Sequence, residues 1–248
     1  MHLSRLPVLV KLYRKIRYRK GFGVHSPFVY NLITKVIEEK SAYYALEEIE
    51  NFRRQLLKDN DLSLITARET QSAAYGALLF RMVNFFKCRN VIEIGSSTGV
   101  MGLYLAMASR TRCQCRLLDE RQGLAQCIRQ FARTHHLSKL QYMEGDYREN
   151  IPSLYAELSG ADLLFINQLP ETMTGSGLMD LCRPLIGRQS ILILDGINRS
   201  KEMHKIWESL KRDPQSRVMV DLYALGIAFF NDKLPKRYYK AYFNYGKK

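Results

Sequence analysis

The sequence predicts an α/β fold: a mostly parallel sheet of seven strands with helices on both faces, an antiparallel hairpin as its last two strands, and a helical extension at the N-terminus. Short apolar runs alternate with amphipathic helical patterns through most of the chain, and this alternation is typical of parallel strands joined by crossover helices. The last two apolar runs are separated by too few residues for a crossover helix. They therefore have to pair as an antiparallel hairpin.

The predicted strands and helices follow one another in a regular order. Five apolar runs mark parallel strands: Val91–Ile94, Arg116–Leu118, Leu140–Met143, Leu163–Ile166 and Ile191–Leu194. Helical patterns lie at Val100–Met107, Leu124–Phe131 and Met203–Leu210. The predicted hairpin joins Val218–Leu222 to Ile227–Phe230, and the aromatic tail after it is expected to form an edge strand.

The first part of the chain reads as a separate extension, so we predict a helical cap over residues 1–70 and a main domain over 71–248. Pro7 can start a helix, and Leu9, Leu12, Tyr13 and Ile16 follow at helical spacing. Further helices are expected after Pro27 and over Tyr43–Lys58, and Asn60–Thr70 reads as a polar connection. A strongly helical pattern resumes after Ser72, with Tyr75, Leu78, Leu79, Met82 and Phe86 on one face.

The net charge of +14 is concentrated near the two ends of the chain. Two interpretations of the basic N-terminal helix stay open. It is either a helix that makes weak contact with nucleic acid or an anionic membrane, or a docking helix whose apolar stripe covers the main domain while its basic face is solvated. The five cysteines form no disulfide framework, no apolar run is long enough to span a bilayer, and a cytoplasmic protein is expected.

The strongest motif for a binding site is a glycine-bearing turn between the first predicted strand and the helix after it. It contains Glu93, Gly95, Ser97 and Gly99. The glycines allow a tight turn and a close approach of ligand and helix, and the amides at the helix start favour polar ligand groups. The spacing is neither that of a dinucleotide fingerprint nor that of a P-loop. Because Glu93 would repel a phosphate, it indicates a ligand with a cationic amine.

Acidic residues also follow the next two strands. Asp119 ends the second strand, where a carboxylate can accept hydrogen bonds from both hydroxyls of a ribose. Gly145 and Asp146 follow the third strand. Ligands of open α/β sheets bind at this carboxyl edge, so these groups are expected to share one site.

The glycine turn, the acidic strand end, the Gly-Asp pair and the closing hairpin resemble the Rossmann-like class I S-adenosylmethionine-dependent methyltransferases, and among them the O-methyltransferase-like members. A group of bacterial, Bacteroidetes-type methyltransferases is similar through Gly23-Val-His25-Ser-Pro27-Phe28-Val-Tyr30 and Ser200-Lys-Glu202-Met203. The resemblance implies S-adenosylmethionine as cofactor. It also implies that Glu93, Gly95, Ser97 and Gly99 hold the methionyl part, Asp119 the ribose and Asp146 the adenine end.

The chain departs from that group at two strand ends. The fourth strand ends in Asn167 where the group has an aspartate, and the fifth ends in Asp195-Gly196-Ile197-Asn198 where the group has Asp-Asp-Ile-His. Catechol-type relatives bind magnesium with carboxylates and an amide at these strand ends. Since only Asp195 remains as a carboxylate, we predict no metal site. Asn167 is expected to position an acceptor or the cofactor amine.

These observations predict a metal-independent methyltransferase that acts on oxygen or nitrogen of a small molecule. Asp195 is the candidate general base, although a helix-capping role explains it equally well. One alternative is a catalytically degenerate member that binds the cofactor and acts through its basic surface on RNA or a membrane. An RNA methyltransferase is a further alternative, but the Asn-Pro-Pro-Tyr type of motif for base-amine methylation does not occur.

Overall fold

The computed structural model describes residues 8–41, 43–58, 63–109 and 112–246, and it confirms the predicted fold class. The strands are β1 Asn90–Ile94, β2 Gln114–Asp119, β3 Leu140–Glu144, β4 Ala161–Ile166, β5 Ile186–Asp195, β6 Val218–Asp221, β7 Leu225–Phe229 and β8 Arg237–Lys240. They form one sheet in the order β3-β2-β1-β4-β5-β7-β6-β8. The pairs from β3 to β5 are parallel, and β7 is antiparallel to both β5 and β6 as the short connection required.

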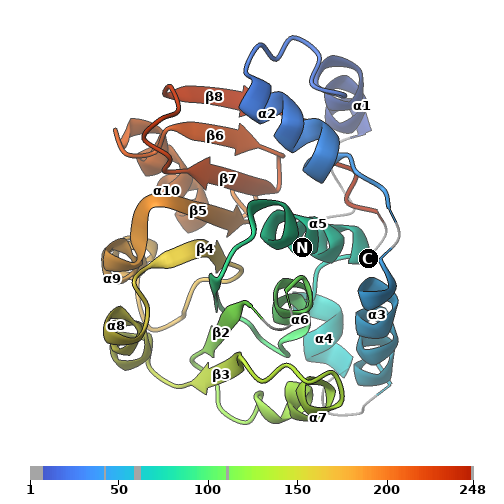
Figure 1. The fold of residues 1–248 in the computed structure, drawn as a ribbon, viewed down its shortest axis with the longest axis vertical. Helices are drawn as coiled ribbons and strands as arrows, with labels where there is room; N and C mark the ends of the chain where they lie inside the picture. Colours follow the sequence, from blue (N-terminus) through green and yellow to red (C-terminus); the bar gives the residue numbers. More distant parts are fainter. Residues whose placement is uncertain (1–7, 42, 59–62, 110–111, 247–248) are drawn as a thin grey trace.

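Helices cover both faces of this sheet (Figure 1). One face carries α5 Ala73–Phe86, α6 Val100–Met107 and α7 Gln126–Thr134, and the other carries α8 Tyr147–Glu157, α9 Gly175–Cys182 and α10 Lys201–Arg212. The N-terminal helices are α1 Val8–Arg17, α2 Pro27–Leu32 with a π-helical turn over Ile33–Ile37, α3 Tyr44–Leu56 and α4 Ser63–Glu69. α3 lies outside α5 and α6, which it contacts, so the N-terminal segment adds a partial third layer on that face.

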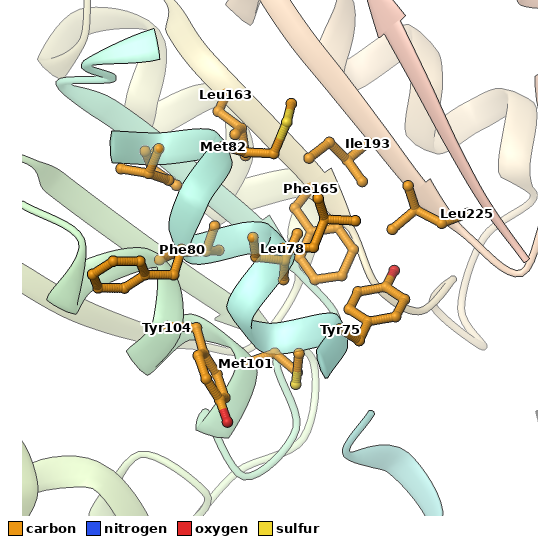
Figure 2. Close-up of a cluster of buried hydrophobic side chains, with 14 of the residues drawn as sticks. Tyr75, Leu78, Phe80, Met82, Met101, Tyr104, Leu163, Phe165, Ile193 and Leu225 are labelled. Carbon is orange, nitrogen blue, oxygen red and sulfur yellow. The ribbon is translucent and has the colours of Figure 1, made fainter. Parts of the chain in front are cut away.

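α5 is the helix that joins the N-terminal layer to the sheet. Ser72 caps its start by accepting a hydrogen bond from the Tyr75 amide, and Lys87 ends it with a left-handed φ of 53°. The predicted apolar face is confirmed at Tyr75, Leu78, Leu79 and Met82, all fully buried. Figure 2 shows this face packed on Phe165 of β4, Ile193 of β5 and Leu225 of β7.

Three details differ from the sequence-based expectations. The polar segment before α5 contains α4, a short helix where a connection was predicted. The sheet has eight strands where seven were predicted, because β8 pairs in parallel with β6; β8 lies at the edge, as expected of the aromatic tail. The docking interpretation of α1 is wrong for the side chains described: Leu12, Tyr13 and Ile16 are exposed, whereas Arg14 is buried. The side chain of Leu9 is not among those that the structure describes.

Strand alternation decides which side of the sheet each polar group meets. Successive side chains of a strand point to opposite faces. Val91, Leu117, Phe165 and Ile193 all belong to the core on the α5–α6 face. Residues two further along each strand therefore share that face, and they are Glu93, Asp119, Asn167 and Asp195. Four polar side chains thus converge on one face at the carboxyl edge.

All five cysteines are free and buried. Burial raises the pKa of Cys88, Cys113 and Cys182 to about 12 in each case. These thiols are consequently protonated packing groups at neutral pH.

Candidate active site

The turn after β1 lies where the strand order reverses, since β2 follows on one side of β1 and β4 on the other. Gly95, Ser97 and Gly99 have φ angles of +74°, +54° and +78°. A Cβ on Gly95 would lie 2.7 Å from the backbone oxygen of Gln168, so the position requires glycine for space as well as for its backbone conformation. The turn therefore lies at the switch point of an α/β sheet, where ligands of such folds usually bind in a crevice outside the carboxyl ends of the strands.

Glu93 lies beneath this turn and is fully buried. Ser96 Oγ donates to it at 2.8 Å and Asn167 Nδ2 donates at 3.2 Å. A Cβ on Gly102 of α6 would lie 2.7 Å from Glu93 Oε2, so the carboxylate needs glycine at that helix position. Burial, and then the nearby Asp119 carboxylate, raise the pKa of Glu93 well above its ordinary value. The site therefore contains a buried acid surrounded by neutral donors, an arrangement that favours a cation beside it.

Asp119 is buried at the end of β2 and accepts a hydrogen bond of 2.7 Å from the Ser97 amide. Its two oxygens also accept from the Arg121 guanidinium, at 2.8 Å from Nε and 2.9 Å from the terminal nitrogen. Arg121 then reaches Glu69 of α4 with two hydrogen bonds of 3.0 Å. An arginine thus covers Asp119 and links the N-terminal layer to the end of β2.

Asp146 has a different position, at the rim of the crevice. Its side chain caps α8 by accepting from the Arg148 amide at 2.8 Å, and it is about half exposed. The Gly145 amide donates to the Asp119 backbone oxygen at 3.0 Å, so the third strand end lies beside the second.

Asn167 lies beside Glu93 and is buried, and its amide has an incomplete set of partners. Among the described residues nothing donates to Asn167 Oδ1, and Gln71 Oε1 near Asp195 likewise has no partner. Buried acceptors without donors are rare and costly in folded proteins. Both atoms therefore indicate a ligand that donates hydrogen bonds at this edge.

Asp195 ends β5 and is held by three donors. Tyr75 Oη donates at 3.1 Å, Gln71 Nε2 donates at 3.0 Å, and Arg199 makes a close ion pair. Burial raises the pKa of Asp195, and the Arg199 charge acts against that rise. Among the residues that the structure describes, no three His, Cys, Asp or Glu side chains are placed to hold a metal ion together.

The structure thus brings together most of the residues predicted from sequence. Glu93, Asn167 and Asp119 are buried at adjacent strand ends, whereas Asp146 lies at the rim. Sequence reasoning missed the partners: Glu69, Gln71, Tyr75 and Arg121. Arg121 stands only two positions after Asp119, and Arg199 stands four positions after Asp195. That local spacing is the signal that could have indicated the two pairs.

The donors and acceptors of this crevice suit S-adenosylmethionine. An ammonium group would satisfy the orphaned Asn167 Oδ1 and lie near the buried Glu93. Asp119 can accept from two vicinal hydroxyls once Arg121 moves aside. The amides of the positive-φ turn already donate within the protein, to the backbone oxygens of Leu118 and Ser96 and to the Asp119 carboxylate, and these bonds hold the turn in shape.

Comparisons with known proteins agree with this geometry. A model of a family described as lysine methyltransferase matches residues 62–208, more than half of the chain. No curated protein matches the chain. The O-methyltransferase of Bacillus cereus, solved with S-adenosylhomocysteine, is 15% identical with a TM-score of 0.58 over 82% of this chain and 97% of that one.

Two further solved structures are similar to the same extent. TomG of Streptomyces achromogenes, an O-methyltransferase of tomaymycin synthesis solved with S-adenosylmethionine, is 15% identical with a TM-score of 0.58, covering 82% of this chain and 94% of that one. The S-adenosylhomocysteine-bound methyltransferase of Podospora anserina is 14% identical with a TM-score of 0.60, covering 79% and 91%. At such identities the structural likeness shows the fold, whereas the family model shows the family. The chain belongs to the lysine methyltransferase family, and it is an S-adenosylmethionine-dependent methyltransferase.

Proposed function

We propose that this methyltransferase acts on an oxygen or nitrogen of a small molecule that binds beside Asp195, and that it does so without a metal ion. The observation that carries the proposal is the environment of Asp195: a buried carboxylate whose solvent-side partner is the Arg199 guanidinium. A guanidinium supplies the positive charge that a bound cation would otherwise provide to this carboxylate. Arg199 is the partner that an acceptor can replace, because about a third of its side chain is exposed.

When bound, S-adenosylmethionine supplies an electrophilic methyl group on a sulfonium, and the sulfur keeps the electron pair of the broken bond. Asp195 takes the proton that the acceptor oxygen or nitrogen loses as its new bond to carbon forms. A raised pKa makes Asp195 a better proton acceptor than an ordinary aspartate. Tyr75 and Gln71 hold the carboxylate in place during the transfer, which contributes positioning rather than charge.

Each remaining predicted residue has a place in this proposal. Asn167 Oδ1 accepts from the amine of the cofactor, Asp119 accepts from the ribose hydroxyls, and Asp146 lies near the adenine end. Glu93 braces the glycine turn from below and balances the charge of the amine. Gly95, Ser97 and Gly99 give the turn its shape.

The N-terminal extension over residues 1–70 contributes to closing the crevice in this proposal. Glu69 of α4 reaches Arg121 over the end of β2, and Gln71, directly after the extension, reaches Asp195 at the end of β5. The boundary between extension and main domain thus passes through the site, where movement of α4 would open or close it.

A lysine side chain is the second candidate acceptor. The family described as lysine methyltransferase favours it. The Asp195 site adds an argument, because a lysine ammonium can take the place of the Arg199 guanidinium beside the carboxylate. The two candidates differ in whether a whole protein or a free small molecule is methylated.

The test is transfer of a radioactive methyl group from labelled S-adenosylmethionine to a panel of phenols, alcohols, amines and lysine-containing peptides and proteins. Each reaction is run with and without EDTA, and S-adenosylhomocysteine binding is measured in parallel by calorimetry. We expect transfer to a small molecule that EDTA does not affect. Labelling restricted to protein lysines would favour the second candidate. Loss of transfer with EDTA, or cofactor binding without transfer to any acceptor, would overturn the proposal.

A further inference from the structure

We propose that α1 and the loop after it form a surface that binds anionic lipid bilayers. Four large side chains within eleven residues point into solvent there: Leu12 is 52% exposed, Tyr13 58%, Ile16 74% and Phe22 72%. Single exposed apolar residues are ordinary, but a gathered group marks an interaction site. We call Leu12, Tyr13, Ile16 and Phe22 the α1 patch.

Ring contacts connect the α1 patch into one surface. The Tyr13 ring meets the Tyr18 ring edge-on at 5.9 Å between centroids. The Arg17 guanidinium lies 5.5 Å from the Tyr18 ring and 5.8 Å from the Phe22 ring. Leu12 and Ile16 lie one helical turn apart, and Tyr13 is next to both. Helix and loop therefore present their apolar groups together.

The α1 patch is exposed because the opposite side of α1 is anchored. Arg14 Nη1 donates to Asp221 at 3.0 Å, and both side chains are about nine-tenths buried. Burial acts to raise the pKa of Asp221, but hydrogen bonds from Arg14 and Tyr238 outweigh it and hold that pKa below the ordinary value. The Tyr242 amide also donates to the Tyr18 backbone oxygen at 3.1 Å. Rolling α1 to hide Ile16 would break this buried ion pair.

Positive charge surrounds the α1 patch. No acidic residue precedes Glu38 in the sequence, and Glu38 itself accepts a hydrogen bond from the Lys20 amide at 2.8 Å. Among the side chains that the structure describes on α1 and its loop, the exposed cations are Lys15, Arg17, Arg19 and Lys20. Lys240 of β8 lies near enough to Tyr13 to act on the pKa of its phenol, so a cation from the C-terminal part of the chain also lies near the α1 patch. Such a surface is attracted to anionic lipid headgroups, each nearby Lys or Arg adding to the binding.

The aliphatic side chains of the α1 patch favour a bilayer over other polyanions as the binding partner. Leu12 and Ile16 offer RNA neither a stacking face nor a hydrogen bond, but they can enter the boundary between headgroups and acyl chains. A second copy of this chain would bring a like-charged surface. Among the described helices none is long and apolar enough to cross a bilayer, so the inferred contact is peripheral.

The surface also lies at the active-site edge of the sheet. β5 and β6 both run antiparallel to β7, so Asp195 and Asp221 end their strands at the same edge. α1, anchored at Asp221, lies two strands away from Asp195. Binding through the α1 patch would therefore turn this edge toward the membrane.

The experiment is flotation of the full chain with vesicles of pure phosphatidylcholine and of phosphatidylcholine containing one-third phosphatidylserine, at low and high salt. The test variant is Leu12→Gln with Ile16→Gln, which keeps every charge. The control is Tyr44→Gln on α3, whose side chain is 77% exposed outside the α1 patch. Thermal melts confirm that all three proteins are folded. Polarisation titrations with single-stranded and duplex RNA run in parallel.

We expect wild type and Tyr44→Gln to float with the anionic vesicles at low salt and to dissociate at high salt. The double variant should bind at least about tenfold more weakly, since two aliphatic side chains no longer enter the bilayer. Equal binding by the double variant would overturn the proposal, because charge alone would then explain it. Failure of wild type to float, with or without RNA binding, would overturn it as well. Methyl-transfer activity does not enter these measurements, so their outcome is independent of the acceptor.

Discussion

Two regions of the carboxyl edge neutralise buried aspartates in different ways. Around the crevice, Asp119 and Asp195 are paired with Arg121 and Arg199, whose side chains are 39% and 31% exposed. At the end of β6, Asp221 is paired with Arg14, which is 11% exposed. A partner that reaches solvent can leave and be rehydrated at small cost, whereas a buried partner cannot. Exposure of the arginine thus distinguishes a binding position from a structural one.

This difference assigns separate tasks to chemically similar pairs. In the proposed function, Arg121 and Arg199 are the partners that a hydroxyl, an amine or a proton donor would replace beside Asp119 and Asp195. Arg14 instead fixes α1 to the sheet, together with Tyr238, which donates to Asp221 at 2.7 Å. Substitutions in the two regions should therefore change activity and binding in one case and stability in the other.

The largest expected effect is on methyl transfer by Asp195→Asn. An amide cannot take the proton of the acceptor, so the rate with the acceptor found by the labelling panel should fall by about 10²–10⁴-fold. Because the folded-state pKa of Asp195 is raised, its protonated form stabilises the fold below the unfolded pKa of about 4, and this stabilisation is lost as pH rises through the folded value. The asparagine variant should then be at least as stable as wild type at pH 7. If turnover is unchanged, Asp195 is not the general base and its role is limited to binding Tyr75 and Gln71.

The next effect is on stability, through Arg14→Ala. Removing one partner of a buried pair leaves Asp221 uncompensated, at a cost of about 3 kcal/mol in urea unfolding at pH 7. The folded pKa of Asp221 is lowered, so its stabilisation is present above the unfolded pKa of about 4 and is lost as pH falls through the folded value. The difference between the two proteins should therefore shrink in acid.

Arg188→Ala is the matched control for this deletion. Its side chain is 87% exposed and pairs with Asp232 at 3.4 Å, so it should change stability by about 0.5 kcal/mol or less. Equal losses from both deletions would contradict the structural role of Arg14.

A smaller effect is expected on cofactor binding by Asp119→Asn. The loss of charge-assisted hydrogen bonds to the ribose should weaken the binding of S-adenosylhomocysteine by about 10–100-fold, as measured by calorimetry. Asp146→Asn is the comparison, since that side chain is about half exposed at the rim and should matter much less. If the two variants bind alike, the ribose does not depend on the buried carboxylate.

The smallest effect should come from Arg121→Gln. In the proposed function, this arginine competes with the cofactor for Asp119. Its removal should raise the fraction of binding-competent molecules and so tighten the binding of S-adenosylhomocysteine by about threefold. Calorimetry at low and high salt measures the change. Weaker binding by the variant would show that Arg121 helps to hold the cofactor, and the proposed exchange of partners would then be wrong.

The fold and the main site groups could be predicted because local patterns determine them. Alternation in four strands places Glu93, Asp119, Asn167 and Asp195 on one face once the strand ends are known. The glycine turn was likewise visible in the spacing of Gly95 and Gly99, where the observed φ angles are positive. The confirmed hairpin followed from the length of its connection.

What could not be predicted depends on partners far apart in the sequence. Periodicity predicted α1 but not its orientation, which is set by Asp221, 207 residues after Arg14. α4 lies in a polar segment, and it is supported by tertiary contacts such as the pair between Glu69 and Arg121. A short helix of this kind has little stability of its own, so its sequence gives a weak signal.

Because all five cysteines are buried, their thiols should have low reactivity in the folded protein. A buried thiol is poorly accessible to maleimides and to peroxide, so the folded protein should stay unlabelled for minutes and tolerate mild oxidants. A cysteine placed at Tyr44 would then carry a fluorophore at a chosen position without removal of the native ones. Conversely, the rate at which the native thiols are slowly modified would measure how often the core opens. A bound cofactor should lower that rate.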